Sequence, residues 1–86
     1  MKLNQEFLVH NTTGESLLVP TGKAPFSGIV RGNRTLGVLF SLLEKETTEN
    51  ELVSAMKERF QAPEGAIEED VARMLSELRR IGALDE

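Results

Sequence analysis

The sequence predicts an α+β protein in which a three-stranded antiparallel sheet is followed by three helices. Short β-prone runs, separated by Gly, Pro, Asn and Thr, fill the first third of the chain. Apolar residues then recur at helical spacing, after clear helix start signals. Because 86 residues leave room for one core, we expect a single domain over residues 1–86.

The first two strands are expected to form a β-hairpin. Residues 7–10 (Phe-Leu-Val-His) and 17–19 (Leu-Leu-Val) are apolar and β-prone. The Asn-Thr-Thr-Gly-Glu segment between them is typical of a hairpin loop. We expect the second strand to be ended by Pro20, Gly22 and Pro25, which carry the chain across to Gly28.

A third, brief strand is expected directly before the first helix. It comprises Gly28, Ile29, Val30 and Arg31. Gly32 then allows the backbone to turn out of the strand. The Asn33 side chain can cap the helix by accepting hydrogen bonds from the free amides of its first turn. An unpaired side of such a strand exposes amides and carbonyls that are either shielded or used.

The first two helices are predicted from their apolar faces and caps. The first, roughly residues 34–45, is apolar nearly all round and therefore belongs in the middle of the domain. The second opens with Thr48 and Glu51, which have the spacing of a capping box. Its expected buried residues are Leu52, Ala55, Met56 and Phe60.

The third helix is expected from Ala66 to Ile81, with Gly82 as its stop. Three acidic residues, 68–70, lie in its first turns, where they favour the positive end of the helix dipole. One clean apolar stripe runs along the helix and comprises Ile67, Val71, Met74, Leu75, Leu78 and Ile81.

Composition and charge exclude several classes of function. The chain has no cysteine, so disulfides and thiol chemistry are excluded, which fits a cytoplasmic protein. No apolar run approaches the ~20 residues that span a bilayer, so no membrane partner is expected. Residues 1–43 carry four basic and two acidic residues, and residues 44–86 carry six basic and twelve acidic ones. An acidic helical half is a poor match for nucleic acid.

The order and spacing of these elements resemble the PqqD family, whose domain is also called the RiPP recognition element. The resemblance rests on the segments GESLLVPTG, GIV, NRTLGVLFSLL, TTENELVSAMKERF and EEDVARMLSELRRIGAL. It covers nearly the whole chain. Gly32 departs from the apolar residue that relatives commonly have before the Asn, and we expect it to loosen the junction between strand and helix.

The resemblance implies a winged helix-turn-helix-like fold and a non-catalytic peptide chaperone. Such a protein binds the leader of a ribosomally made precursor peptide as an added strand between the third strand and the third helix. It then presents the peptide to a modifying enzyme, often a radical SAM protein. Carried onto this chain, the implied binding residues are Gly28, Ile29, Val30, Arg31, Ile67, Asp70, Val71, Met74 and Leu78.

The charges near the third strand suggest which leader would fit. Arg31, with Arg34 and Lys23 nearby in sequence, would attract acidic residues, while Met74 could adapt to an apolar anchor. The hypothesis is therefore an amphipathic leader with acidic and apolar residues. The competing interpretation of the helix stripe is packing in the core. For the two arginines it is ordinary solvation at the surface.

Two other functions remain open alternatives. The element order could support a winged-helix DNA-binding transcriptional regulator, although the helix that would enter the groove begins Ile-Glu-Glu-Asp, which repels phosphate. A small enzyme has less support, because there is no nucleophile and base pair, phosphate loop or metal cluster. We expect no cofactor, no metal and no catalytic residue. Without a peptide, the exposed strand could also pair with a second copy in a homodimer.

Overall fold

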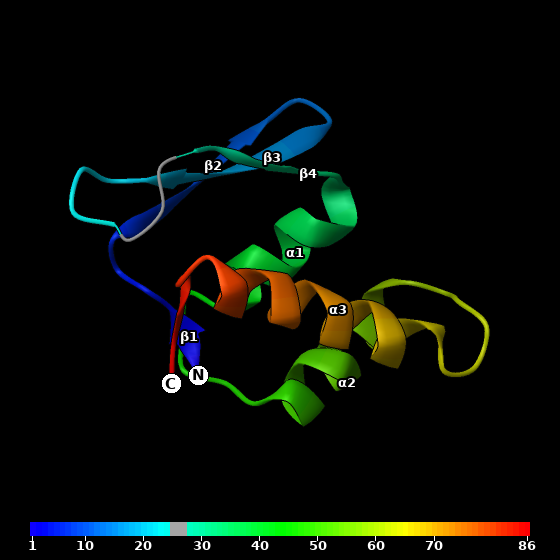
Figure 1. The fold of residues 1–86 in the computed structure, drawn as a ribbon. Helices are drawn as coiled ribbons and strands as arrows, with labels where there is room; N and C mark the ends of the chain where they lie inside the picture. The colour runs from blue at the N-terminus through cyan, green and yellow to red at the C-terminus, as the bar shows by residue number, and fades with distance from the viewer. Residues whose placement is uncertain (25–27) are drawn as a thin grey trace.

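The computed structural model describes residues 1–24 and 28–86, and in it a three-stranded sheet lies across a layer of three helices (Figure 1). The helix α1 (Arg34–Leu42) runs between the sheet and the other two helices, α2 (Glu49–Arg59) and α3 (Ala66–Arg80). This is the α+β architecture that the sequence predicts. Within the described ranges, no helix is both long and apolar enough to cross a membrane.

The predicted hairpin is present, and its strands are longer than expected. β2 (Phe7–Thr12) pairs with β3 (Glu15–Pro20), from Phe7 opposite Pro20 to Thr12 opposite Glu15. The turn between them is therefore short, and Gly14 adopts the left-handed region with a φ of 84°. Leu18 is fully buried against the helices, while Leu8 on the outer face is 57% exposed. Pro25, expected to help end this strand, lies outside the described residues.

The third strand of the sheet, β4, spans Val30–Gly32, whereas the sequence predicted Gly28–Arg31. It pairs antiparallel with β3, with Val30 opposite Leu18 and Gly32 opposite Ser16. The predicted boundary was wrong because Gly28 and Ile29 precede the ladder and Gly32 belongs to it. A Cβ on Gly32 would lie 2.7 Å from the Leu36 Cβ, so the missing side chain allows a close contact with α1 rather than a loose junction.

The predicted helix caps are confirmed in part. The Asn33 Oδ1 accepts from the Leu36 amide at 3.0 Å, and the Thr48 Oγ1 accepts from the Glu51 amide at 3.2 Å. The expected capping box is only half made, because the Glu51 carboxylate accepts from the Thr47 hydroxyl.

The first helix, α1, ends at Leu42, three residues earlier than predicted. The cause lies outside the helix, because the Leu43 carbonyl accepts from the Leu3 amide at 2.8 Å and the Thr47 amide donates to the Met1 carbonyl. Leu39 and Phe40 are fully buried, as expected for a central helix.

A second, two-stranded ribbon was not predicted from the sequence. β1 (Lys2–Leu3) pairs with β5 (Leu84–Asp85), so the two chain ends lie side by side (Figure 1). Strands this short carry no periodicity. The chain is directed into β5 by the stop at Gly82, whose φ is 76°: the Gly82 amide donates to the Arg79 carbonyl, and the Ala83 amide to the Leu78 carbonyl. These two bonds form a Schellman motif, so the predicted glycine stop is confirmed.

At Gly37, α1 lies very close to the sheet. A Cβ built there would collide with the Ser16 Oγ and lie 2.9 Å from the Ser16 Cβ. Ser16 is itself buried and donates to the Asn11 Oδ1 at 2.7 Å, so it has little room to move. The absence of a side chain at Gly37 therefore sets the distance between helix and sheet.

We predict that Gly37→Ala lowers the free energy of unfolding by about 1–3 kcal/mol, because the added methyl overpacks a filled contact. Gly22→Ala is the matched control, since a Cβ at Gly22 meets no atom within 4 Å. Urea denaturation of both variants measures the difference. Equal stabilities of the two variants would contradict this account of the contact.

Candidate functional site

The outer edge of β4 is the first part of the candidate site. β4 is the last strand in the order β2-β3-β4, and no other strand of the described residues pairs with its far side. Val30 is half-buried on the same face as Leu18, and Arg31 is exposed on the opposite face. The edge therefore offers unpaired backbone groups next to one apolar and one basic side chain.

The second part is the amino-terminal half of α3. Ile67, Asp70 and Met74 are half-buried and reach the surface, whereas Val71 and Leu78 are 0% and 2% exposed. The two buried residues belong to the core and support the surface from behind. Of the predicted stripe, only Ile67 and Met74 therefore present apolar side chains to a ligand.

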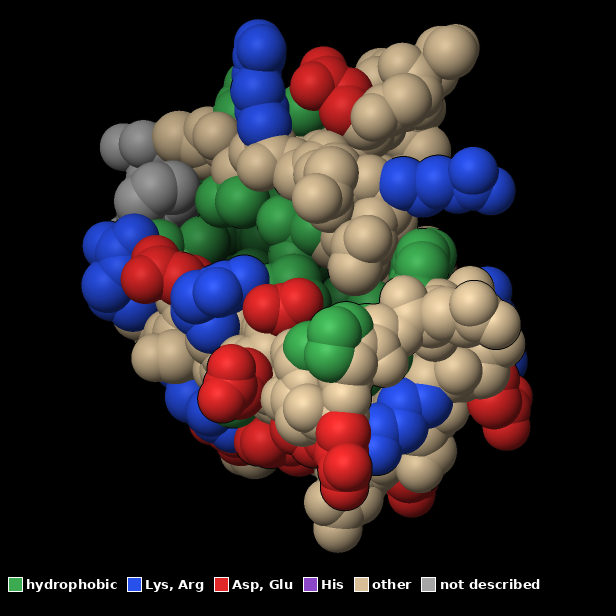
Figure 2. Space-filling view, turned by 90° about the vertical axis from the view of Figure 1, so that its right-hand side faces the viewer, with side chains coloured by type: hydrophobic (Ala, Val, Ile, Leu, Met, Phe, Trp, Pro, Cys, Tyr) green, Lys and Arg blue, Asp and Glu red, His purple; other side chains and the backbone are tan. Residues whose placement is uncertain are grey.

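A pocket of about 190 Å³ brings four of the predicted helix residues together. It is lined by Thr35, Met56, Phe60, Gln61, Ala62, Ile67, Asp70, Val71 and Met74. Three helices thus contribute, and Thr35 in the first turn of α1 lies five residues after Val30 in the chain. Figure 2 views the molecule from the right-hand side of Figure 1. It shows a hollow with hydrophobic side chains at its floor and acidic and basic side chains along its rim.

The structure does not gather all of the predicted residues. Gly28 and Ile29 precede β4 and do not line the pocket, and Ile29 is 56% exposed. The sequence predicted Met56 and Phe60 as buried, which is confirmed for Met56 at 2% exposed, and did not predict Thr35 as a binding residue. All three line the pocket. The incomplete burial of Phe60 has a local cause: the residue is the C-cap of α2, where its backbone has left the helix.

Charges of both signs surround the pocket. The Asp70 carboxylate lies 2.9 Å from the Arg73 guanidinium, one turn along α3. No ion pair of the described residues includes Arg31, so its charge is available on the strand side.

An ion pair links α2 to the start of α3. The Lys57 ammonium lies 2.7 Å from the Glu68 carboxylate, and this hydrogen bond holds the pKa of Glu68 below its ordinary value. The pair joins the two helices whose side chains line most of the pocket.

Comparison with known proteins supplies a family and a fold. The family model described as "Coenzyme PQQ synthesis protein D (PqqD)" matches residues 15–84. The solved structure "TbiB1 in Complex with the TbiA(beta) Leader Peptide" superposes with a TM-score of 0.76 at 19% sequence identity, covering 99% of this chain and 100% of that one. No curated protein matches.

Acid should weaken the link between α2 and α3. Since the folded-state pKa of Glu68 is lowered, its stabilising effect is present above the unfolded-state value near 4.5 and is lost as the pH falls through the folded-state value. We predict that Glu68→Gln lowers Tm at pH 6 by no more than about 3 °C, because both partners are largely exposed, and that this difference vanishes near pH 3.

The matched control for this test is Glu69→Gln. Glu69 is exposed on the same turn and forms no ion pair with the described residues. Thermal unfolding followed by circular dichroism gives both pH profiles. If Glu68→Gln and Glu69→Gln differ from wild type equally at every pH, the ion pair has no role in stability.

Proposed function

The chain belongs to the PqqD family, and from this premise we propose that it is a non-catalytic peptide chaperone, a single domain that binds the leader of a ribosomally made precursor peptide. One observation carries the proposal. The strand Val30–Gly32 has an unpaired edge, and Thr35, which follows it closely in the chain, lines an apolar pocket. The similar structure TbiB1 was solved with a leader peptide, which supports the same class of ligand here.

In this proposal the leader adds a strand to β4 and lies between β4 and α3. Main-chain hydrogen bonds to the edge supply affinity that does not depend on sequence, and side-chain pockets supply specificity. An apolar side chain of the leader enters the pocket between Met74 and Phe60. Met74 suits this role, because a flexible thioether adapts to different shapes.

The charges around the site predict where acidic residues of the leader lie. Arg31 on the strand attracts acidic residues, whereas the carboxylate of Asp70 at the pocket disfavours them. We therefore expect an amphipathic leader whose acidic residues lie along β4 and whose apolar residue lies at the pocket.

The chemistry itself belongs to a partner in this proposal. The protein holds the leader and presents the remainder of the precursor to a modifying enzyme, for which a radical SAM maturase is our first candidate. It uses no cofactor of its own. The proposal places it in the cytoplasm, where a ribosomally made peptide is first present.

The alternative, a winged-helix DNA-binding regulator, receives less support from the electrostatics of α3. The first turn of the helix carries Glu68 and Glu69. Further along, the guanidinium of Arg73 pairs with Asp70, and that of Arg80 pairs with Glu77 at 2.8 Å. A recognition helix whose basic residues are engaged by its own carboxylates attracts phosphate weakly.

We predict that Met74→Glu weakens leader binding at least about tenfold, because a carboxylate replaces an apolar wall of the pocket next to Asp70. The first ligand to test is a synthetic TbiA(beta) leader peptide, the kind of ligand bound in the similar structure, and isothermal titration calorimetry measures its Kd. Ser76→Glu is the matched control, since it adds the same charge to an exposed position of the same helix. Equal affinities of the two variants would argue against the pocket as the binding site.

The strand edge is tested by nuclear magnetic resonance on the same complex. Leader binding should shift the amide resonances of Val30 and Arg31 and slow the solvent exchange of the one whose N–H points away from β3, because only that amide gains a hydrogen-bond partner. Shifts confined to α3 would exclude strand addition and leave only a pocket ligand.

We also propose that, without leader, the β4 edge pairs with the same edge of a second copy. Sedimentation equilibrium should then show a dimer whose fraction rises with concentration and falls on addition of leader. A monomer at every concentration would refute the dimer without affecting the leader proposal.

A further inference from the structure

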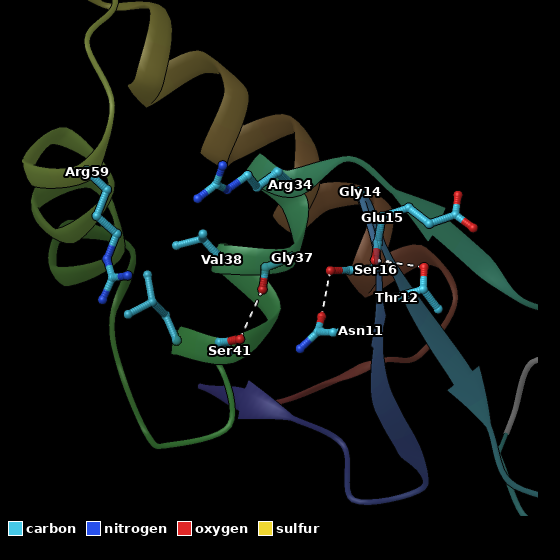
Figure 3. Close-up of a pocket in the computed structure, with 11 residues that line it drawn as sticks. Asn11, Thr12, Gly14, Glu15, Ser16, Arg34, Gly37, Val38, Ser41 and Arg59 are labelled. Carbon is cyan, nitrogen blue, oxygen red and sulfur yellow. Dashed lines mark hydrogen bonds between the residues drawn. The ribbon is translucent and has the colours of Figure 1, made fainter.

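A second and larger pocket, of about 530 Å³, lies where the tip of the β2–β3 hairpin meets α1 and α2. It shares no lining residue with the 190 Å³ pocket. Figure 3 shows its lining side chains, which come from the hairpin, from the exposed side of α1 and from the end of α2. The proposed leader site does not use this pocket.

Two arginines line the pocket from different helices. Arg34 is the first residue of α1 and Arg59 is the last residue of α2. Figure 3 shows them on either side of Val38, with the carboxylate of Glu15, the one acidic lining residue, directed away from both. Neither arginine takes part in an ion pair within the described residues.

The position of Arg34 is unfavourable for the helix that carries it. A cation at a helix amino terminus faces the positive end of the helix dipole, and the first turn of α1 has no acidic residue to offset it. Residues that are unfavourable for their own helix or strand are expected at functional sites, so the position of Arg34 is consistent with a role in binding a ligand.

The hydroxyl groups of the pocket already donate hydrogen bonds within the protein. The Ser16 hydroxyl donates to the Asn11 Oδ1 at 2.7 Å, and the Ser41 hydroxyl donates to the Gly37 carbonyl at 3.1 Å (Figure 3). Val38 and Leu42 also line the pocket, are half-buried and provide apolar surface. A ligand therefore meets two charged donors beside a small apolar floor.

We propose that this pocket docks an acidic segment of a partner protein. In the docked state carboxylates of the segment bind Arg34 and Arg59, and an apolar side chain rests on Val38 and Leu42. A peptide fits better than a small anion, because a single phosphate would leave most of the 530 Å³ and the apolar floor unfilled. The inference goes beyond the proposed function, since it concerns a second ligand that binds while the leader site is free or filled.

The probe for the test is a synthetic acetylated and amidated peptide of alternating Glu and Leu, titrated into the isotope-labelled full chain. The probe also has the chemistry of the proposed leader, so binding at this pocket is measured from the resonances of Gly37 and Ser41. We expect shifts of these amides, binding that weakens as salt is raised, and an affinity about tenfold lower for the double variant Arg34→Gln/Arg59→Gln. The double variant Arg73→Gln/Arg80→Gln is the matched control, because both residues lie on α3 outside the pocket and the variant loses the same two charges. Wild-type affinity is expected for it.

Several outcomes would overturn the proposal. They are equal binding at Gly37 by the double variant and wild type, equal binding there of a peptide with Gln in place of Glu, and shifts around Met74 without any shift at Gly37. Inorganic phosphate that displaces the peptide at equal concentration would mean a small-anion site and would also overturn it. The single variant Arg59→Gln keeps the test valid if the double variant loses its fold, since Arg59 is an exposed helix-end residue.

Discussion

The close approach of α1 to the sheet is the constraint on which the rest of the structure depends. At Gly37 the helix backbone lies against Ser16 of β3, and at Gly32 the end of β4 lies against Leu36 of α1. Because Gly32 and Gly37 have no side chain, the sheet and α1 can approach each other closely at both positions. With α1 fixed, its buried residues Leu39 and Phe40 form the centre of the core, and α2 and α3 pack around them.

The same helix separates the two proposed binding surfaces. Arg34 and Thr35 are neighbours in the first turn of α1, yet Arg34 lines the pocket of about 530 Å³ and Thr35 lines the pocket of about 190 Å³. Successive residues of a helix point about 100° apart, so adjacent positions serve different faces. A rigid helix start, capped by Asn33, therefore holds both surfaces at a fixed distance from β4.

Much of the fold could be predicted from the sequence, because its signals are local. The loop before Glu15, the cap at Asn33 and the stop at Gly82 each act within a few residues. The ribbon of β1 and β5 and the early end of α1 depend on contacts between distant segments, which no local pattern contains. For the same reason the helix stripe could not show that Val71 and Leu78 are almost wholly buried, whereas Ile67 and Met74 reach the surface at the pocket.

The brevity of β4 has a kinetic consequence. A strand of three residues offers few main-chain hydrogen bonds to an added peptide, so most of the binding energy has to come from side chains. Affinity differences between related complexes arise mainly in the dissociation rate, and a short ladder favours rapid dissociation. On the proposed function, residence time would thus be limited by the strand itself, which suits a carrier that must release its peptide to a catalyst after every turnover.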